Sequence, residues 1–545
     1  MELRIITLLT KIRAIIAIFT LILLTGCASS NEPRVVFITA TPVQSVQAIP
    51  ATNPPVTTVA ISPTEVLPPI VQDNAPTPDS PRFTAQSQAQ QTDDEYVIQA
   101  GDTLSAVATR YGINVNILLE LNDIADPNTL FVGQVIRLPG IPVEQTPLVK
   151  LISDHRFVRG PGSNNFDIDA FIQQQAGYIR VASDEVITRL ANGQERREVL
   201  GAGEIIQRIS LEFSVDPRLL LALLEYRAGW LSQSQIAGER VSYPLISELA
   251  SGAIDRSGLY KQLAWASNIL NYGYYGWKFN GWTALTFSDS TRLLYAEGLN
   301  AASVGLQYFL SQNQAVVNWR QDVALTGFYT TYVRYFGDPF TGVLEPLVAS
   351  SIVQPSFTLP FSSGETWFYT GGAHGGWGAG SAWSAIDFAP PDEPPDGIFC
   401  YTSNYWVTAV SSGIITHSDN GMVILDVDGD ADDTTGWSVI YLHLAESGRI
   451  ASGTVVSVGD QIGRPSCEGG FSTATHMHIA RRYNGEWIPA DCQICPPQFA
   501  RPQFNMSGWN VIGILNQEYQ GFLENNNQRR VAEQGRLTPE NRISW

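Results

Sequence analysis

The chain is poor in charge, in histidine and in basic residues. Only 16% of its 545 residues are charged, against 44% that are hydrophobic, and it has six histidines and five cysteines. Its 33 basic residues are outnumbered by 52 acidic ones, so the formal net charge is −19. Nucleic-acid binding needs a basic stripe along the phosphates, and the sequence shows none. The composition therefore argues against a nucleic-acid partner and favours several globular domains.

A long apolar run is also missing. Lys11 and Arg13 precede a run of only eleven mainly apolar residues, 14–24, which is short for a membrane-spanning helix. Leu24-Thr25-Gly26-Cys27 follows and resembles a bacterial lipobox, whose cysteine is lipidated. We therefore expect residues 1–27 to be a lipoprotein signal peptide with Cys27 as the lipidation site, and an ordinary secretory signal is the alternative. Both predict export, and acylation predicts a membrane anchor facing the cell wall or periplasm.

Residues 28–93 show no helical or strand periodicity. They are rich in Pro, Thr, Ser and Ala, as in ATPVQSVQAIPATNPPVTTVAISPTEVLPP. A segment of this composition buries too little apolar surface to fold. We expect a disordered tether.

Residues 94–140 predict a small domain with the order βααβ. Strand formers occur at 95–98 and 133–139, and helical spacing occurs around 104–111 and over 115–122. The motifs Y-x-I/V-x-x-G-D-T-L, L-x-x-L-N and G-Q-x-I-x-L-P resemble a LysM module. That family binds N-acetylglucosamine-containing glycans such as peptidoglycan. The resemblance implies a shallow glycan-binding groove near Gly101, Asp102, Thr103 and Leu130.

The sequence predicts that residues 141–352 are mostly helical. Ile205, Ile209 and Phe213 recur at helical spacing, and Asp216-Pro217 is typical of a helix start. The stretch 214–224 faintly resembles lysozyme-like lytic transglycosylases, but the family's glutamate position holds Arg227-Ala228. Glu225 stands two positions early, about 200° around a helix, so it would face the wrong way. We expect a mostly helical domain without glycosidase activity, and a degenerate lysozyme-like domain is one interpretation of it.

An aromatic cluster follows in this region. It comprises Tyr272, Tyr274, Tyr275, Trp277, Phe279 and Trp282. Aromatic rings stack on sugars, but they also fill helical cores. We favour the core.

From residue 353 the sequence predicts an antiparallel sheet of short strands. Strand formers occur at 406–410, 413–417, 422–426 and 438–444 between Gly, Pro, Asp and Ser. The sequence His476-Met477-His478 places two histidines one residue apart. In a strand, i and i+2 lie on one face, so both imidazoles point toward one spot and Met477 points away. That arrangement suits a zinc site.

Further motifs support this reading. TGGAHGGWGAGSAWSAIDFAPP carries His374 and Asp387, and Tyr-Leu-His-Leu carries His443. Together with V-x-x-G-D-x-I-G and C-E-G-G-x-S-T-x-x-H-x-H, they resemble the lysostaphin and beta-lytic zinc metallopeptidases, which cleave peptidoglycan peptides. The resemblance implies one zinc ion bound by His374, Asp387 and His478. His443 and His476 would flank the reacting water, one as general base and both as stabilisers of the oxyanion.

One feature departs from most of that family, which has His and Asp four residues apart. Trp383 stands four residues before Asp387, and His374 stands thirteen before it. The beta-lytic branch has a similarly long glycine-rich interval, so we assign the chain to that branch. If His374 were not a ligand, the site would be inactive.

The four remaining cysteines all lie in the C-terminal region, as Cys400, Cys467, Cys492 and Cys495. Four cysteines allow three pairings. The beta-lytic resemblance favours Cys400 with Cys467 and Cys492 with Cys495. A second zinc site at Cys492-x-x-Cys495 is the alternative.

Three smaller predictions remain. Residues 426–433 form an acidic hairpin rather than an EF-hand loop, because glycine is fourth instead of sixth and Trp437 stands twelfth. Weak calcium binding remains open there. Trp377 and Trp383 line a groove beside His374. His155 and His417 are surface or structural residues.

As a whole, the sequence predicts a multidomain α+β cell-wall hydrolase. It would be an exported, zinc-dependent endopeptidase that hydrolyses peptide cross-links of peptidoglycan, targeted by the LysM module and anchored by lipid. The main alternative is a non-catalytic wall-binding regulator of other peptidoglycan hydrolases, which is expected to lack zinc residues. A secreted protease acting on proteins is a further alternative.

Overall fold

The computed structural model describes most of the chain from Glu95 onward. The described residues are 95–99, 101–111, 115–122, 124, 126, 130–138, 144–236, 238–251, 254–289, 291–395, 397–470, 472–515, 517–533 and 539–545. The predicted signal peptide, Cys27 and tether lie outside them. Within the described residues, no helix combines the length and the apolar character needed to cross a membrane.

The first part of the chain that the structure describes is the small βααβ domain. Its elements are β1 (Glu95–Val97), α2 (Leu104–Tyr111), α3 (Val115–Leu121) and β2 (Val135–Arg137). The two strands pair antiparallel, with Tyr96 opposite Ile136. Leu104, Val107 and Leu118 from the helices pack with these strand residues into a separate core. The element order is the one that the LysM resemblance implied.

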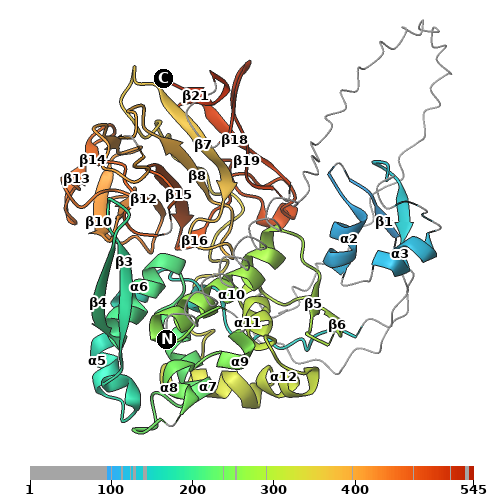
Figure 1. The fold of residues 1–545 in the computed structure, drawn as a ribbon. Helices are drawn as coiled ribbons and strands as arrows, with labels where there is room; N and C mark the ends of the chain where they lie inside the picture. Colours follow the sequence, from blue (N-terminus) through green and yellow to red (C-terminus); the bar gives the residue numbers. More distant parts are fainter. Residues whose placement is uncertain are drawn as a thin grey trace, which may run out of the picture. The chain divides into compact units, whose positions relative to one another are not determined.

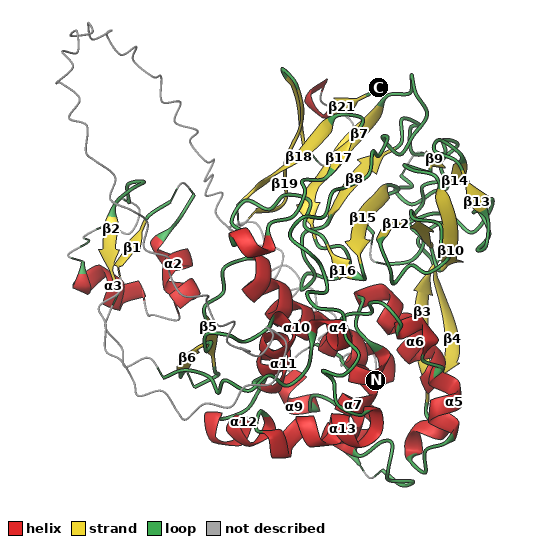
Figure 2. Ribbon diagram, turned by 180° about the vertical axis from the view of Figure 1, so that it is seen from behind, coloured by secondary structure: helices red, strands yellow, loops and turns green. Residues whose placement is uncertain are grey.

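A mostly helical region follows (Figure 2). Its helices are α4 (Asp154–Phe157), α5 (Ile168–Gln173), α6 (Ala202–Phe213), α7 (Pro217–Ala228), α8 (Glu239–Ser242), α9 (Glu248–Ser251), α10 (Leu259–Phe279), α11 (Ala301–Leu310), α12 (Val316–Asp322) and α13 (Thr330–Phe336). Two hairpins interrupt them, β3 (Ser183–Arg189) with β4 (Glu195–Gly201) and β5 (Ala284–Thr286) with β6 (Arg292–Leu294). The helix α7 starts as predicted, since the Asp216 side chain accepts from the Arg218 N–H and Pro217 occupies the first turn.

The C-terminal region is built on an antiparallel sheet (Figure 1). Among the described residues, nine strands form it in the order β13-β10-β11-β12-β15-β8-β7-β21, with β16 beside β15. They are β7 (Trp367–His374), β8 (Ala385–Ala389), β10 (Gly413–Asp419), β11 (Met422–Asp426), β12 (Trp437–Leu442), β13 (Val455–Val456), β15 (Met477–Tyr483), β16 (Glu486–Trp487) and β21 (Arg542–Ile543). Smaller sheets pair β9 (Val407–Thr408) with β14 (Gln461–Gly463) and join β17 (Asn505–Met506), β18 (Trp509–Ile514), β19 (Gln517–Asn525) and β20 (Gln528–Val531).

The two faces of the large sheet have different cores. Ile440 and Ala480 are directly opposite each other on β12 and β15, and both belong to the core that includes the helical region. The next pair, Tyr441 and Ile479, points to the other face and belongs to a second core. This period-two alternation places the helical region on one face of the sheet.

A buried ion cluster fastens the helical region to that sheet. Lys278 on α10 binds Glu486 on β16 at 2.5 Å, and Tyr274 donates to the same carboxylate oxygen at 2.7 Å. Arg501 binds the other oxygen of Glu486 at 3.0 Å. Glu486 is fully buried, and a buried charge needs a partner of opposite charge. Lys278 and Arg501 supply these partners.

Candidate metal centre

Three strands bring the predicted ligands together. His478 on β15 is the direct cross-strand partner of Asp387 on β8. His374 is the last residue of β7, the other neighbour of β8, rather than part of the glycine-rich loop that the sequence suggested. His478 lies two residues before Ala480, so the three side chains lie on the face of the sheet that the helical region covers.

The ligand atoms of this trio converge. The Nε2 of His374 lies 3.0 Å from the Nδ1 of His478. Asp387 Oδ1 lies 3.2 Å from the first of these nitrogens and 3.3 Å from the second. Atoms bound about 2.0–2.2 Å from a tetrahedral zinc lie roughly 3.3–3.6 Å apart. The trio therefore fits a zinc ion, with two imidazoles and one carboxylate as the donor set.

Backbone carbonyls fix the orientation of both imidazoles. The Nδ1–H of His374 donates to the carbonyl of Gly372 at 2.7 Å, which leaves Nε2 free for a metal. The Nε2–H of His478 donates to the carbonyl of Gly376 at 3.1 Å, which leaves Nδ1 free. Hydrogen bonds of this kind select the tautomer of a metal-binding histidine.

Asp387 is held as a buried anion. Burial raises its pKa, but electrostatic attraction by the imidazoles of His374 and His476 outweighs burial and holds the pKa well below its usual value. Its Oδ1 has no hydrogen-bond partner among the described residues. Gly371 on β7 makes room for this carboxylate, because a Cβ there would lie 2.3 Å from Asp387 Oδ2.

His443 and His476 form a second pair of imidazoles beside the trio, with ring centroids 4.5 Å apart. The Nδ1–H of His443 donates to the carbonyl of Glu468 at 2.9 Å, and the Nδ1–H of His476 donates to that of Ala474 at 2.8 Å. Both Nε2 atoms are therefore left as proton acceptors. Burial, followed by repulsion from His476 and His478, lowers the pKa of His443 well below its usual value and keeps it neutral.

The structure changes the local setting that the sequence predicted for two of these residues. His443 was expected within a strand, but β12 ends at Leu442 and His443 has a left-handed backbone with φ of 67°. His476 directly precedes β15 and is joined to Ser466 by a single bridge. His476 and His478 still face the same side, and Met477 is buried in the opposite core as predicted.

These imidazoles line a cleft of ≈ 1060 Å³. Trp377 lies in its wall, as the sequence predicted, and packs edge-on against Phe213 of α6. Three tyrosines that the sequence analysis missed also line it, and one of them is Tyr401. Tyr519 on β19 stacks on the His374 ring at 4.3 Å, and Tyr260 comes from α10. No local motif marks either residue, because both reach the cleft only through tertiary packing.

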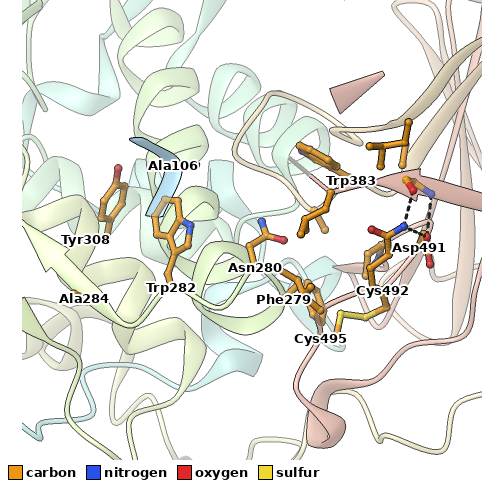
Figure 3. A pocket seen from close by; sticks show the side chains of 18 of the residues that line it. Ala106, Phe279, Asn280, Trp282, Ala284, Tyr308, Trp383, Asp491, Cys492 and Cys495 are labelled. Carbon is orange, nitrogen blue, oxygen red and sulfur yellow. Dashed lines mark hydrogen bonds between the residues drawn. A yellow bond between two sulfur atoms is a disulfide. The ribbon is translucent and has the colours of Figure 1, made fainter. Parts of the chain in front are cut away.

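The prediction for Trp383 was wrong. It does not line this cleft but a separate pocket of ≈ 700 Å³ (Figure 3). That pocket also contains Trp282, Asn280 and the Cys492–Cys495 disulfide (Figure 3). The side chain of Trp383 instead packs against the second core of the sheet. Trp383 stands only nine residues after His374 in the sequence. This proximity did not determine where its side chain points.

The aromatic cluster of the helical region is divided between core and surface. Tyr274, Tyr275 and Phe279 are buried as predicted. Tyr272 and Trp282 are only half-buried and stack on each other, with ring planes 8° apart.

The cysteines form two disulfides, Cys400–Cys467 and Cys492–Cys495, which is the pairing that the resemblance implied. Cys467 directly precedes Glu468, whose carbonyl orients His443. The first disulfide therefore holds the loop that orients this histidine.

The remaining sequence predictions concern residues outside the cleft. Glu225 accepts hydrogen bonds from the N–H groups of Leu231 and Ser232 and from the hydroxyl of Tyr335, so its carboxylate is used in the fold. His155 is buried and its Nδ1 accepts from the Leu344 N–H, a structural role.

His417 lies half-buried on β10, and burial lowers its pKa to about 4. The acidic segment forms the hairpin between β11 and β12, as predicted.

The proposed glycan-binding residues lie near the turn after β1 and before β2. Asp102 accepts from the Tyr96 hydroxyl at 2.6 Å, and Thr103 accepts from the Ala106 N–H at 3.1 Å. Gly101 has a φ of 91°, which favours glycine. Leu130 is half-buried against the small core. These contacts explain the turn, while glycan binding stays a prediction.

The fold and the site thus define a mixed α/β protein with helices, antiparallel sheets and a histidine–aspartate–histidine cluster. The family model "LysM domain" matches residues 96–139, and "LasA, N-terminal domain" matches residues 150–349, the helical region. Protease LasA of Pseudomonas aeruginosa is 24% identical over 362 residues, which cover 63% of this chain and 76% of that relative. N-acetylmuramoyl-L-alanine amidase XlyB of Bacillus subtilis is 49% identical over 45 residues, 8% of this chain and 14% of that protein.

Two solved structures are similar to parts of the chain. The M23 metalloprotease pseudoalterin, from the deep sea, shares 24% identity over 33% of this chain and 96% of its own, with a TM-score of 0.26. The catalytic domain of lysostaphin from Staphylococcus simulans shares 24% identity over 23% of this chain and 81% of its own, with a TM-score of 0.15. Over 63% of its length the chain is thus similar to Protease LasA, and residues 96–139 match the LysM domain model.

Proposed function

We propose that the chain is a zinc-dependent endopeptidase that hydrolyses peptide cross-links of peptidoglycan. The observation that carries the proposal is the convergence of His374 Nε2, His478 Nδ1 and the unpartnered Asp387 Oδ1 within 3.0–3.3 Å of one another. The relation to Protease LasA supports peptide hydrolysis, and the LysM domain supports the cell wall as the place of action.

The chain's own residues would supply orientation and proton transfer. Zinc held by His374, Asp387 and His478 would act as a Lewis acid toward the scissile carbonyl and would make water easier to deprotonate. His443 and His476 each present an Nε2 lone pair to the cleft, because their Nδ1–H groups are bound to backbone carbonyls. One imidazole would accept the water proton and deliver it to the leaving amine. The other, after taking a proton from solvent, would donate its Nε2–H to the oxyanion.

The shape of the cleft favours a thin peptide. Gly375, Gly376 and Gly378 line it beside Trp377, so this part of its wall has few side chains. Small residues such as Gly or D-Ala would fit against these glycines. We retain Gly101, Asp102, Thr103 and Leu130 as the proposed glycan groove. Export and lipidation at Cys27 would place the enzyme at the wall.

The test is digestion of purified peptidoglycan sacculi by the chain from Ala28 to Trp545, with mass spectrometry of the released fragments. We expect new peptide N-termini from the native protein and from His417→Ala, which removes a strand histidine outside the cleft. His478→Ala should release none. If the zinc-loaded native protein releases no fragment either, the catalytic proposal is wrong and a wall-binding regulator becomes the better account.

A further inference from the structure

A second group of carboxylates lies in the hairpin between β11 and β12, outside the cleft. Asp426, Asp428 and Asp430 each place one carboxylate oxygen within 4.8 Å of the others. Asp426 is the last residue of β11 and is 0% exposed, while Asp428 and Asp430 are exposed. The group therefore combines a fixed, buried carboxylate with two that solvent can reach.

The carboxylate of Asp426 has only one of its two oxygens in a hydrogen bond with the described residues. Its Oδ2 accepts a hydrogen bond from the Ala431 N–H at 2.8 Å. Its Oδ1 is buried and has no hydrogen-bond partner among the described residues. A buried carboxylate oxygen without a donor is unfavourable.

The loop conformation is compatible with cation binding. The three aspartates occupy positions one, three and five, and Ala431 at position six has a left-handed φ of 66°. Position six is where calcium loops of the EF-hand type make their sharp turn, usually with glycine. Trp437 replaces the glutamate of position twelve, so fewer protein oxygens are available and water must complete the shell.

We propose that Asp426, Asp428 and Asp430 bind one Ca²⁺ ion. All three donors are carboxylate oxygens, which suit a hard cation, and no histidine or cysteine belongs to the group. The exposed side and the missing glutamate favour a weak site, with a Kd of roughly 0.1–1 mM, as in extracellular calcium modules. This site does not depend on the proposed zinc centre.

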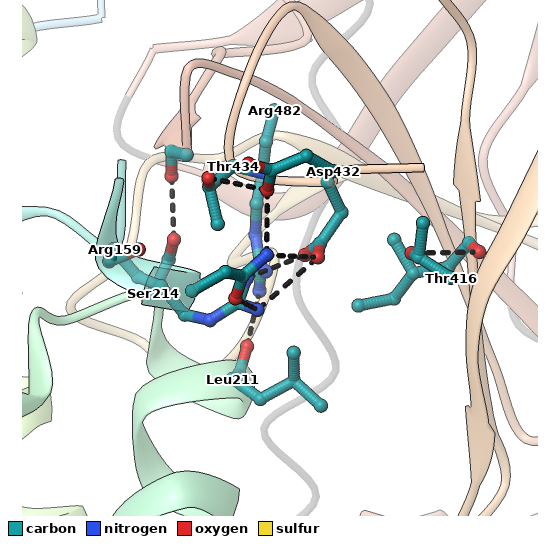
Figure 4. A network of polar contacts seen from close by, with 12 residues as sticks. Arg159, Leu211, Ser214, Thr416, Asp432, Thr434 and Arg482 are labelled. Carbon is teal, nitrogen blue, oxygen red and sulfur yellow. Dashed lines mark hydrogen bonds and ion pairs between the residues drawn. The ribbon is translucent and has the colours of Figure 1, made fainter. Parts of the chain in front are cut away.

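The site has a structural consequence because the same loop docks on the helical region (Figure 4). Asp433 forms a buried ion pair with Arg159 at 2.5 Å, and Asp432 accepts from Asn164 at 2.6 Å. Both aspartates follow the three proposed ligands in the same loop, after Ala431. Calcium would therefore fix the loop that joins the sheet to residues 159–164 and would stabilise that contact.

Isothermal titration of CaCl₂ into the chain from Ala28 to Trp545, freed of calcium beforehand, tests the proposal. We expect one Ca²⁺ per chain, with Asp428→Asn and Asp430→Asn each weakening binding tenfold or more. Asp419→Asn is the matched control, since it makes the same charge change at the exposed turn at the other end of β11 and should leave the Kd unchanged. Both ligand variants alter exposed side chains, so they should fold.

A thermal unfolding series supplies a second readout. Calcium at 5 mM should raise the Tm of the native protein and of Asp419→Asn, but not that of Asp430→Asn. No heat of binding up to 10 mM Ca²⁺, or equal binding by Asp430→Asn, would overturn the site. Equal or tighter binding of Mg²⁺ would overturn the assignment to calcium.

Discussion

Two buried charged clusters lie on the large sheet, and one is closed while the other is open. Both oxygens of Glu486 are occupied, by Lys278 and Tyr274 on one side and Arg501 on the other. Asp387 Oδ1 instead faces two imidazole nitrogens and has no hydrogen-bond partner among the described residues. Since buried polar groups are normally satisfied, the closed cluster indicates a structural role and the open one indicates a ligand-binding site.

Breaking the open cluster should have the largest effect on activity. Asp387→Ala should remove zinc and lower kcat/KM by at least ~10³-fold, because a catalytic metal supplies several kcal/mol of transition-state stabilisation. The measurements are zinc content and hydrolysis of a cross-linked muropeptide. Thermal unfolding distinguishes this loss from misfolding. Retention of activity by Asp387→Ala would contradict the assigned ligand.

Removing a neighbouring imidazole should separate chemistry from metal binding. His443→Ala should lower kcat by about 10²–10⁴-fold, the usual contribution of general acid–base catalysis, while zinc content and KM stay close to the native values. His443 is buried beside the trio but is not a member of it. Loss of zinc from His443→Ala would show that it holds the metal instead.

Breaking the closed cluster should affect stability instead. Glu486→Ala should lower the free energy of unfolding by about 3–5 kcal/mol, because it leaves Lys278 and Arg501 buried without their carboxylate. Denaturant titration measures the change. Zinc content should remain one per chain under native conditions. If Glu486→Ala were as stable as the native protein, the ion cluster would not hold the helical region on the sheet.

The smallest expected effect also comes from the closed cluster. It is a dependence of the free energy of unfolding on pH. Burial raises the pKa of Glu486, but Lys278 and Arg501 outweigh it and lower the pKa below the usual value. A lowered folded pKa means that the unfolded chain binds the proton first. This stabilisation is therefore complete above the unfolded pKa of about 4.3 and is lost as pH falls toward the folded pKa. Unfolding of Glu486→Gln between pH 5 and 3 should show a shallower decline than the native protein. Equal slopes would contradict the lowered pKa.

The contrast also shows what sequence could provide. Strand periodicity placed His476, Met477 and His478 on their correct faces, since side chains alternate in any strand. The family resemblance supplied the residues of the trio, which the structure brings together. Neither could place Trp383, whose direction depends on the packing of a loop. Neither could find Tyr260 or Tyr519.

The closed cluster could not be predicted from the sequence either. Lys278 and Glu486 are separated by 208 residues, and no local pattern joins them. The unpartnered oxygen of Asp426 could not be predicted from the sequence, because it depends on the burial of the end of β11. Local periodicity and motifs determine which face a side chain takes, whereas the satisfaction of a buried charge depends on residues far away in the chain.

The most direct test of the account is the number of zinc ions per chain, measured by mass spectrometry of the metal in three proteins. We predict one zinc in the native chain and in Glu486→Gln, and none in Asp387→Ala. Zinc in all three, or in none, would contradict the claim that the open cluster of His374, Asp387 and His478 is the metal centre.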